Sequence, residues 1–150
     1  MANVRGCNLP DELLYDVENH IWYQEMPDGN IKLGMTTVAT GMAGQLVAYT
    51  PKKVGRKVEA GKSCATVESG KWVGPAKSAA GGEIVAVNED LAGKPSLANE
   101  DPYDKGWLVI VKPDDWASVK ATLTPGSQVA APYEAKMAAD GFAGCGGCAT

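Results

Sequence analysis

The sequence predicts a mainly β domain, a small sandwich or barrel with short flanking helices that gather toward the C-terminus. Eighteen glycines and nine prolines in 150 residues indicate frequent turns and therefore short strands. Runs rich in β-branched and aromatic residues recur between these turn residues. The length is typical of one domain with a real hydrophobic core.

Six to eight short strands are expected. Residues 20–36 (HIWYQEMPDGNIKLGMT) have the composition of a hairpin, with PDGN supplying its turn. Residues 44–51 predict a strand that ends at its proline, and residues 54–69 predict two strands separated by a turn at EAG. Further strands are expected from Glu83 to Val87 and over residues 107–113, which read WLVIVKP.

Helices are expected mainly near the end of the chain. The polar connection DLAGKPSLANEDPYDKG has room for one helical turn. Asp114 is expected to cap a short helix that ends near Ala121. Residues 131–141 predict another helix, with Pro132 near its start and Gly141 after its end.

The net charge, the length of the apolar runs and the number of cysteines argue against several functional classes. A net charge of −4 argues against a general nucleic-acid binder. No apolar run approaches the roughly 18 residues of a membrane span, and the opening residues lack a signal-peptide core. We therefore expect a cytoplasmic protein without nucleic-acid or membrane partners. Four cysteines are too few for a disulfide scaffold and are expected to be mostly thiols.

The stretch VESGKWVG (67–74) places a lysine at the point where one strand ends and the next begins. Gly70 can adopt a positive φ, so a tight reversal is feasible there, with Lys71 at or beside its apex. From the residues alone, Lys71 is either an ordinary solvated turn lysine or a group held out for chemistry.

Residues 64–113 closely resemble the lipoyl-bearing segment of the H protein of the glycine cleavage system. The resemblance rests on five features: VES (67–69), a lysine two residues after it (71), GEIVAVNE (82–89), NEDPY (99–103) and GWL (106–108). HIW, DGNIKLGMT and VGRKVEAG resemble the family's opening, and YEA resembles its last helix. The resemblance covers roughly residues 18–138.

The resemblance implies a barrel-sandwich hybrid of the lipoyl-domain type, with short flanking helices that include a C-terminal one. It also implies a non-catalytic carrier with lipoate attached covalently to Lys71 by a lipoate-attaching ligase. Glu68, Gly70 and Trp72 would shape recognition of the tip. Lys77 belongs to the following strand and is not expected to be modified. We expect a carrier domain over residues 1–141 and a cysteine-containing tail over 142–150.

Two residues depart from the family pattern, in which valine precedes the lysine and small residues follow it. Gly70 and Trp72 stand in these places. Trp72 is either a partner contact or a cross-strand packing residue. GKWVGP together with a cysteine-bearing tail looks more like the H-protein-like lipoate-binding proteins of bacterial sulfur oxidisers. That resemblance implies a carrier of sulfur-containing intermediates that serves a heterodisulfide-reductase-like complex. Glycine cleavage enzymes, with an aminomethyl cargo, are the alternative partners.

The tail contains a second candidate functional motif, CGGC, in which Cys145 and Cys148 are possible redox thiols. This spacing permits a disulfide between near neighbours, metal ligation or thiol exchange with lipoamide. Zinc would need two further ligands, for which Cys7, Cys64 and His20 are the candidates, although His20 is expected to be structural. Three hypotheses therefore remain: a lipoyl carrier, a thiol or metal module of the tail, and an unmodified relative.

Overall fold

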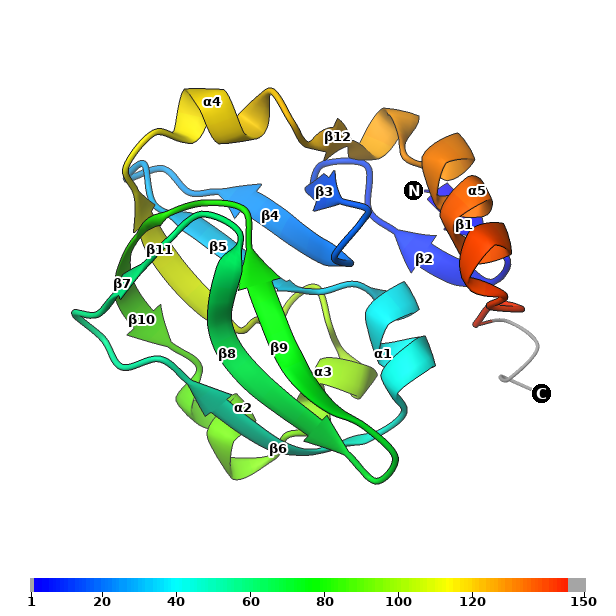
Figure 1. The fold of residues 1–150 in the computed structure, drawn as a ribbon, viewed down its shortest axis with the longest axis horizontal. Coiled ribbons are helices and arrows are strands. Elements are labelled where there is room, and N and C mark those ends of the chain that lie inside the picture. The colour runs from blue at the N-terminus through cyan, green and yellow to red at the C-terminus, as the bar shows by residue number, and fades with distance from the viewer. Residues whose placement is uncertain (1, 146–150) are drawn as a thin grey trace.

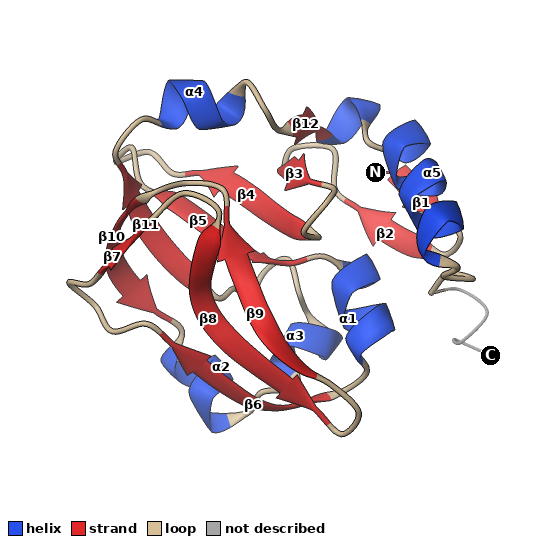
Figure 2. Cartoon of the chain, viewed as in Figure 1, coloured by secondary structure: helices blue, strands red, loops and turns tan. Residues whose placement is uncertain are grey.

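The computed structural model describes residues 2–145, and two antiparallel sheets dominate it (Figures 1 and 2). The strands are β1 (Ala2–Val4), β2 (Cys7–Leu9), β3 (Leu14–Asp16), β4 (Ile21–Glu25), β5 (Ile31–Met35), β6 (Leu46–Pro51), β7 (Lys57–Val58), β8 (Lys62–Ser69), β9 (Val73–Ser78), β10 (Gly82–Val87), β11 (Val109–Pro113) and β12 (Thr124–Pro125). The helices are α1 (Thr37–Ala43), α2 (Glu89–Gly93), α3 (Leu97–Glu100), α4 (Trp116–Lys120), the 3-10 turn η1 (Gly126–Gln128) and α5 (Ala130–Asp140).

The larger sheet has seven strands in the order β12-β3-β4-β5-β11-β10-β7, and the smaller has the order β6-β8-β9. The β4–β5 hairpin turns at PDGN as predicted. Gly29 has a φ of +87°, and the Met26 amide donates to the Asn30 carbonyl at 2.9 Å. The mainly β class, the sandwich-like pairing of sheets and the C-terminal helix are confirmed.

The main core contains buried apolar side chains from both sheets. Leu33, Ile84 and Val111 of the larger sheet belong to the same cluster as Ala65 and Val67 of β8. Alternation along β8 sends these two residues inward and leaves Thr66 and Glu68 exposed. The strand that carries the tip is thereby anchored by its own inward face.

A second core lies beside the first, among β1, β2, β3 and α5. Tyr15, Trp22 and Tyr133 are fully buried there. The Trp22 indole donates to the Pro102 carbonyl at 2.9 Å, which satisfies its buried N–H. A Cβ on Gly34 would stand 2.8 Å from Trp22 Cε2, so the glycine makes room for this ring.

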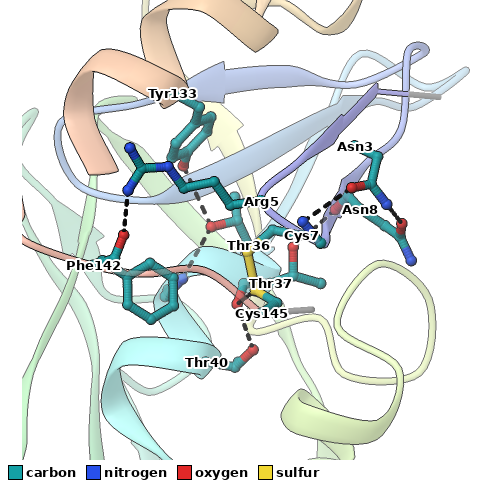
Figure 3. The surroundings of a disulfide bond; sticks show 12 residues. Asn3, Arg5, Cys7, Asn8, Thr36, Thr37, Thr40, Tyr133, Phe142 and Cys145 are labelled. Atoms are coloured by element: carbon teal, nitrogen blue, oxygen red, sulfur yellow. Dashed lines mark hydrogen bonds between the residues drawn. A yellow bond between two sulfur atoms is a disulfide. The ribbon is translucent and has the colours of Figure 1, made fainter. Parts of the chain in front are cut away.

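A disulfide joins Cys7 of β2 to Cys145, which follows α5 (Figure 3). The expectation of mostly reduced thiols is therefore wrong for these two cysteines, whereas Cys64 is a thiol. Tertiary packing brings the pair together across 138 residues of sequence. The Arg5 guanidinium donates to the Phe142 carbonyl at 2.8 Å, and the Cys145 amide donates to the Arg5 carbonyl at 2.9 Å.

Within the described residues, the beginning of the tail packs against the body. Phe142 and Cys145 contact the second core, and a Cβ on Gly41 of α1 would stand 3.0 Å from the Phe142 ring. Cys148 lies outside the described residues. The division between residues 1–141 and a separate tail stays a prediction.

Several elements differ from the sequence prediction. Strands β1 to β3 and helix α1 were not expected, and the polar connection forms two short helices, α2 and α3. Asp115, not Asp114, caps α4, because its carboxylate accepts from the Ser118 amide at 3.3 Å. Helix α5 ends as predicted, with Gly141 left-handed at a φ of +69°.

Candidate functional site

The β8–β9 hairpin reverses at the segment that holds Lys71. Val67 pairs with Gly74 and Glu68 with Val73, and the Ser69 amide then donates to the Trp72 carbonyl at 2.7 Å. Gly70 and Lys71 are the two residues left at the turn. The lysine therefore stands at the tip, as the sequence predicts.

The reversal does not use a positive φ at Gly70, so that expectation is wrong. The Ser69 hydroxyl instead accepts from the Lys71 amide at 3.3 Å, a local side-chain bond that shapes the turn. A Cβ at Gly70 would have no atom within 4 Å. Gly70 thus leaves the approach to Lys71 open.

Lys71 is exposed, and its ammonium has no hydrogen bond or ion pair with residues 2–145. Its side chain leans toward the end of α1, where Cε lies 3.3 Å from the place of a Cβ on Gly44. Lys77, by contrast, lies within β9. Acylation of Lys71 would break no hydrogen bond or ion pair among the described residues.

Trp72 lies against its own hairpin while remaining 40% exposed. A Cβ on Gly74 would stand 2.8 Å from Trp72 Cε2, so the indole covers the glycine two residues later. Glu68 faces solvent beside Val73 and Ala48 on the neighbouring strands. The predicted recognition residues Glu68, Gly70 and Trp72 all lie at or next to the tip.

A cleft of about 480 Å³ begins beside Lys71 and runs along α1. Its lining is mainly apolar and comprises Asn19, His20, Ile21, Met35, Ala39, Met42, Ala43, Val67, Lys71, Trp72, Pro75 and Ala76. No carboxylate lines this cleft within the described part of the chain. It offers an apolar side chain on the tip a place to lie out of water.

His20 lines the cleft and lies in a turn before β4, not in a strand as expected. Its φ is +58°, its Nδ1 lies 3.2 Å from the Tyr133 hydroxyl, and its Nε2 lies 3.8 Å from Asp140. Burial is the largest cause that lowers the pKa of His20 below 6.5, and the Lys136 charge adds to it. The packing agrees with a structural role.

Motifs far from the tip brace the cleft. Asn99 of NEDPY donates its side-chain amide to the Gly44 carbonyl at 2.9 Å, and its carbonyl accepts from the Leu46 amide at 2.9 Å. These bonds fix the chain between α1 and β6, including Gly44, which Lys71 Cε approaches. The Tyr103 hydroxyl bonds the Thr37 amide at 3.0 Å at the start of α1.

Sequence reasoning missed α1 and therefore the cleft. A signal was present, since Thr36 caps the helix by accepting from the Ala39 amide and Gly44 follows its end at a φ of +84°. That α1 would face the tip could not be predicted, because the contact depends on how both sheets pack.

Of the two possible redox thiols of the tail, only Cys145 lies within the described residues, so the tail site stays a prediction. Cys145 is bonded to Cys7, and no cluster of three or more metal-ligating side chains occurs among residues 2–145. Burial raises the pKa of the Cys64 thiol to about 12, so this cysteine is a poor nucleophile.

Fold and site together define a carrier protein, with one reachable lysine on a hairpin tip beside an apolar cleft. Residues 13–136 match the family described as "Glycine cleavage H-protein". The chain belongs to this family, whose members are non-catalytic carriers with lipoate covalently attached to a lysine. No helix within residues 2–145 is long and apolar enough to cross a membrane.

Individual relatives support membership of this family. The chain is 52% identical over 134 residues to "Glycine cleavage system H protein 5" of Aquifex aeolicus, covering 87% of this chain and 90% of the relative. It is 43% identical over 109 residues to "Glycine cleavage system H protein 2" of the same organism, covering 73% and 68%. A crystal structure of a glycine cleavage system H protein from Mycobacterium marinum superposes with a TM-score of 0.72 at 33% identity, covering 89% of this chain and 99% of that one.

Lipoate fits the site. Attachment at Lys71 would convert its ammonium to a neutral amide, and the apolar arm would have Ala39 and Met42 of the adjacent cleft to lie against. When bound, lipoate supplies a dithiolane that accepts electrons or acyl-like groups. The protein's own residues would present the arm, and the cleft lining would shield it.

Proposed function

We propose that Lys71 is the lipoylated residue and that the protein presents this arm to successive enzymes. The supporting observation is the position of Lys71 at an open hairpin tip, without bonds to its ammonium from residues 2–145. Next to Lys71 lie Glu68, Gly70 and Trp72. The lipoate-attaching ligase and the client enzymes would contact these residues when they recognise the tip. The unmodified-relative hypothesis would leave both this exposure and the adjacent apolar cleft without a purpose.

We further propose that the arm carries sulfur-containing intermediates and not an aminomethyl group. An aminomethyl adduct ends in a primary amine, which is cationic near neutral pH. Burying that charge beside Ile21, Met35 and Ala39 without a counter-charge would be costly. No carboxylate lines the cleft among the described residues, and Asp140, which lies 3.8 Å from His20 Nε2, is paired with Lys136 at 3.5 Å; this favours a cargo that is neutral, such as an uncharged sulfur adduct.

The proposed clients follow from this cargo. They are a heterodisulfide-reductase-like complex of cytoplasmic sulfane sulfur oxidation, with glycine cleavage enzymes as the alternative. One relative's organism has H proteins numbered 2 and 5, and several H proteins in one organism favour more than one set of clients. The exposed face of Trp72 would contribute to the choice of client.

The competing thiol or metal module through Cys145 and Cys148 is less well supported, because Cys145 is paired with Cys7. Truncation after Gly144 discriminates the two hypotheses. A carrier keeps its lipoylation without the last six residues, whereas a tail module loses its activity.

Attachment is tested by incubating the purified protein with a lipoate ligase and lipoate. The matched variants are Lys71→Arg and Lys77→Arg, which remove lysines six residues apart on the same hairpin. We expect the lipoyl mass increment to disappear in Lys71→Arg and to persist in Lys77→Arg. The reverse result would exclude the proposed attachment site.

The cargo is tested by giving the lipoylated protein to each set of clients. One reaction contains glycine, the glycine decarboxylase and the aminomethyltransferase. The other contains the heterodisulfide-reductase-like complex and a sulfane sulfur donor. Mass spectrometry of the Lys71 peptide should find a sulfur adduct in the second reaction and little aminomethyl adduct in the first. A dominant aminomethyl adduct would identify a glycine cleavage carrier instead.

A further inference from the structure

We propose that the reduced lipoyl arm exchanges electrons with the Cys7–Cys145 disulfide of the same chain. The protein would then hold two redox centres, one on the arm and one in the body. This inference rests on the proposed lipoylation of Lys71, and it gives a function to a disulfide that the carrier role leaves unexplained.

The two centres both approach the C-terminal part of α1, one at Gly41 within the helix and the other at Gly44 just after its end. Lys71 Cε lies 3.3 Å from the place of a Cβ on Gly44, and Cys145 Sγ lies 3.3 Å from the place of a Cβ on Gly41. Gly41 and Gly44 are three positions apart, about one helical turn. Lys71 Cε and Cys145 Sγ are therefore separated by at most about 15 Å.

A lipoyl-lysine arm is comparable in length to this separation. From Lys71 Cε to a dithiolane sulfur the extended arm is about 10 Å long, at roughly 1.2 Å per bond, and rotation of the lysine side chain adds to its reach. The Lys71 side chain is exposed and unbonded among residues 2–145, so it can swing from its present direction. In Figure 1, α1 lies between the β8–β9 tip and the chain that follows α5.

The disulfide has one accessible sulfur. Cys7 is fully buried, whereas Cys145 is partly exposed. Attack on a disulfide proceeds at one sulfur while the other departs. The exposure pattern directs an incoming thiolate to Cys145 and makes Cys7 the leaving sulfur.

The step is balanced. One thiolate of the dihydrolipoyl group attacks Cys145 Sγ and forms a mixed disulfide, and the Cys7 sulfur leaves with the electron pair of the broken bond. The second lipoyl thiol then attacks the lipoyl sulfur of the mixed disulfide, closes the dithiolane and releases Cys145. The two lipoyl protons pass to the two cysteines. The lipoyl group is oxidised and the cysteine pair is reduced by two electrons.

The surroundings accommodate the reduced pair. Cys145 Sγ lies 3.4 Å from the Thr37 carbonyl oxygen, which can accept a hydrogen bond from the thiol once the disulfide opens (Figure 3). If the protein is cytoplasmic, as proposed, a disulfide that takes part in exchange is more usual than a purely structural one.

The test uses full-length protein lipoylated in vitro, in the Cys148→Ser background so that only one disulfide can form from the tail. Intact mass first establishes that Lys71 is lipoylated. Dihydrolipoamide dehydrogenase and NADH then reduce the arm, and iodoacetamide labels free thiols over time. The matched control is Lys71→Arg with the same enzyme and an equal concentration of free dihydrolipoamide.

We expect Cys7 and Cys145 to become labelled at least about tenfold faster in the lipoylated protein than in the control, at a rate independent of protein concentration. In a Cys7→Ser variant, which has no disulfide to reduce, the labelling of Cys145 should not depend on the arm. Equal labelling rates in lipoylated protein and control would overturn the exchange while leaving the carrier function intact. Failure to attach lipoate at Lys71 would overturn both.

Discussion

The indole of Trp72 lies on the backbone of Gly74, so that a Cβ on this glycine would stand 2.8 Å from Cε2 of the ring. The Trp72 side chain, next to the tip lysine, can occupy this position because Gly74 has no side chain. The hairpin holds the ring against β9 while 40% of it stays exposed for a partner. Trp72 also lines the cleft beside Lys71.

Gly74→Ala should therefore displace the indole and cost about 1–2 kcal/mol of the free energy of unfolding. In a Trp72→Ala background the same substitution should be close to neutral. Urea denaturation of the wild type, both single variants and the double variant measures this coupling. Additive effects would show that the ring does not depend on Gly74.

The disulfide between Cys7 and Cys145 should stabilise the fold strongly, because it closes a loop across 138 residues. Cys7→Ser should lower the free energy of unfolding by roughly 3–5 kcal/mol under oxidising conditions. Cys148→Ser is the matched control and should have little effect. If both variants unfold at the same urea concentration as the wild type, the proposed pairing is absent in solution.

His20 should make the protein less stable as the pH falls. Its pKa is lowered in the folded state, so the unfolded chain binds more protons between the folded pKa and 6.5. The stabilisation is present above pH 6.5 and is lost as the pH falls toward the folded pKa. His20→Asn tolerates the positive φ and lacks this titration. Its loss of stability between about pH 7.5 and 5.5 should be smaller than that of the wild type.

Cys64 should resist alkylation in the native protein, because burial raises its thiol pKa to about 12. Iodoacetamide at pH 8 should label Cys64 only in denaturant. Rapid labelling of the folded protein would mean that β8 opens readily at this position.

The cleft should shield the lipoyl arm. Ala39→Trp would fill the space between α1 and the hairpin, so reduction of the dithiolane by a soluble phosphine should become several-fold faster. Thr66→Trp, on the outward face of β8, is the matched control and should leave the rate unchanged. Equal rates in all three proteins would indicate that the arm does not occupy the cleft.

The sequence predicted what depends on local chemistry. PDGN is a complete turn signal, Gly141 a complete helix-end signal, and VESGKWVG placed Lys71 at a tip. What depends on distant packing was missed. The pairing of Cys7 with Cys145 requires β2 and the chain after α5 to meet, and local spacing drew attention to Cys148 instead.

Short elements were also poorly predicted. Strands β1 to β3 have three residues each, too few for a periodic signal, and they are formed by pairing and burial. The cleft depends on α1 lying beside the hairpin, and the Asn99 bonds that brace it cross more than fifty residues of sequence.

The most direct test of the account is the intact mass of the protein purified from its native host, followed by fragmentation to locate any modification. The account predicts one lipoyl increment, located on Lys71. An unmodified Lys71, or a lipoyl group on another lysine such as Lys77, would contradict it.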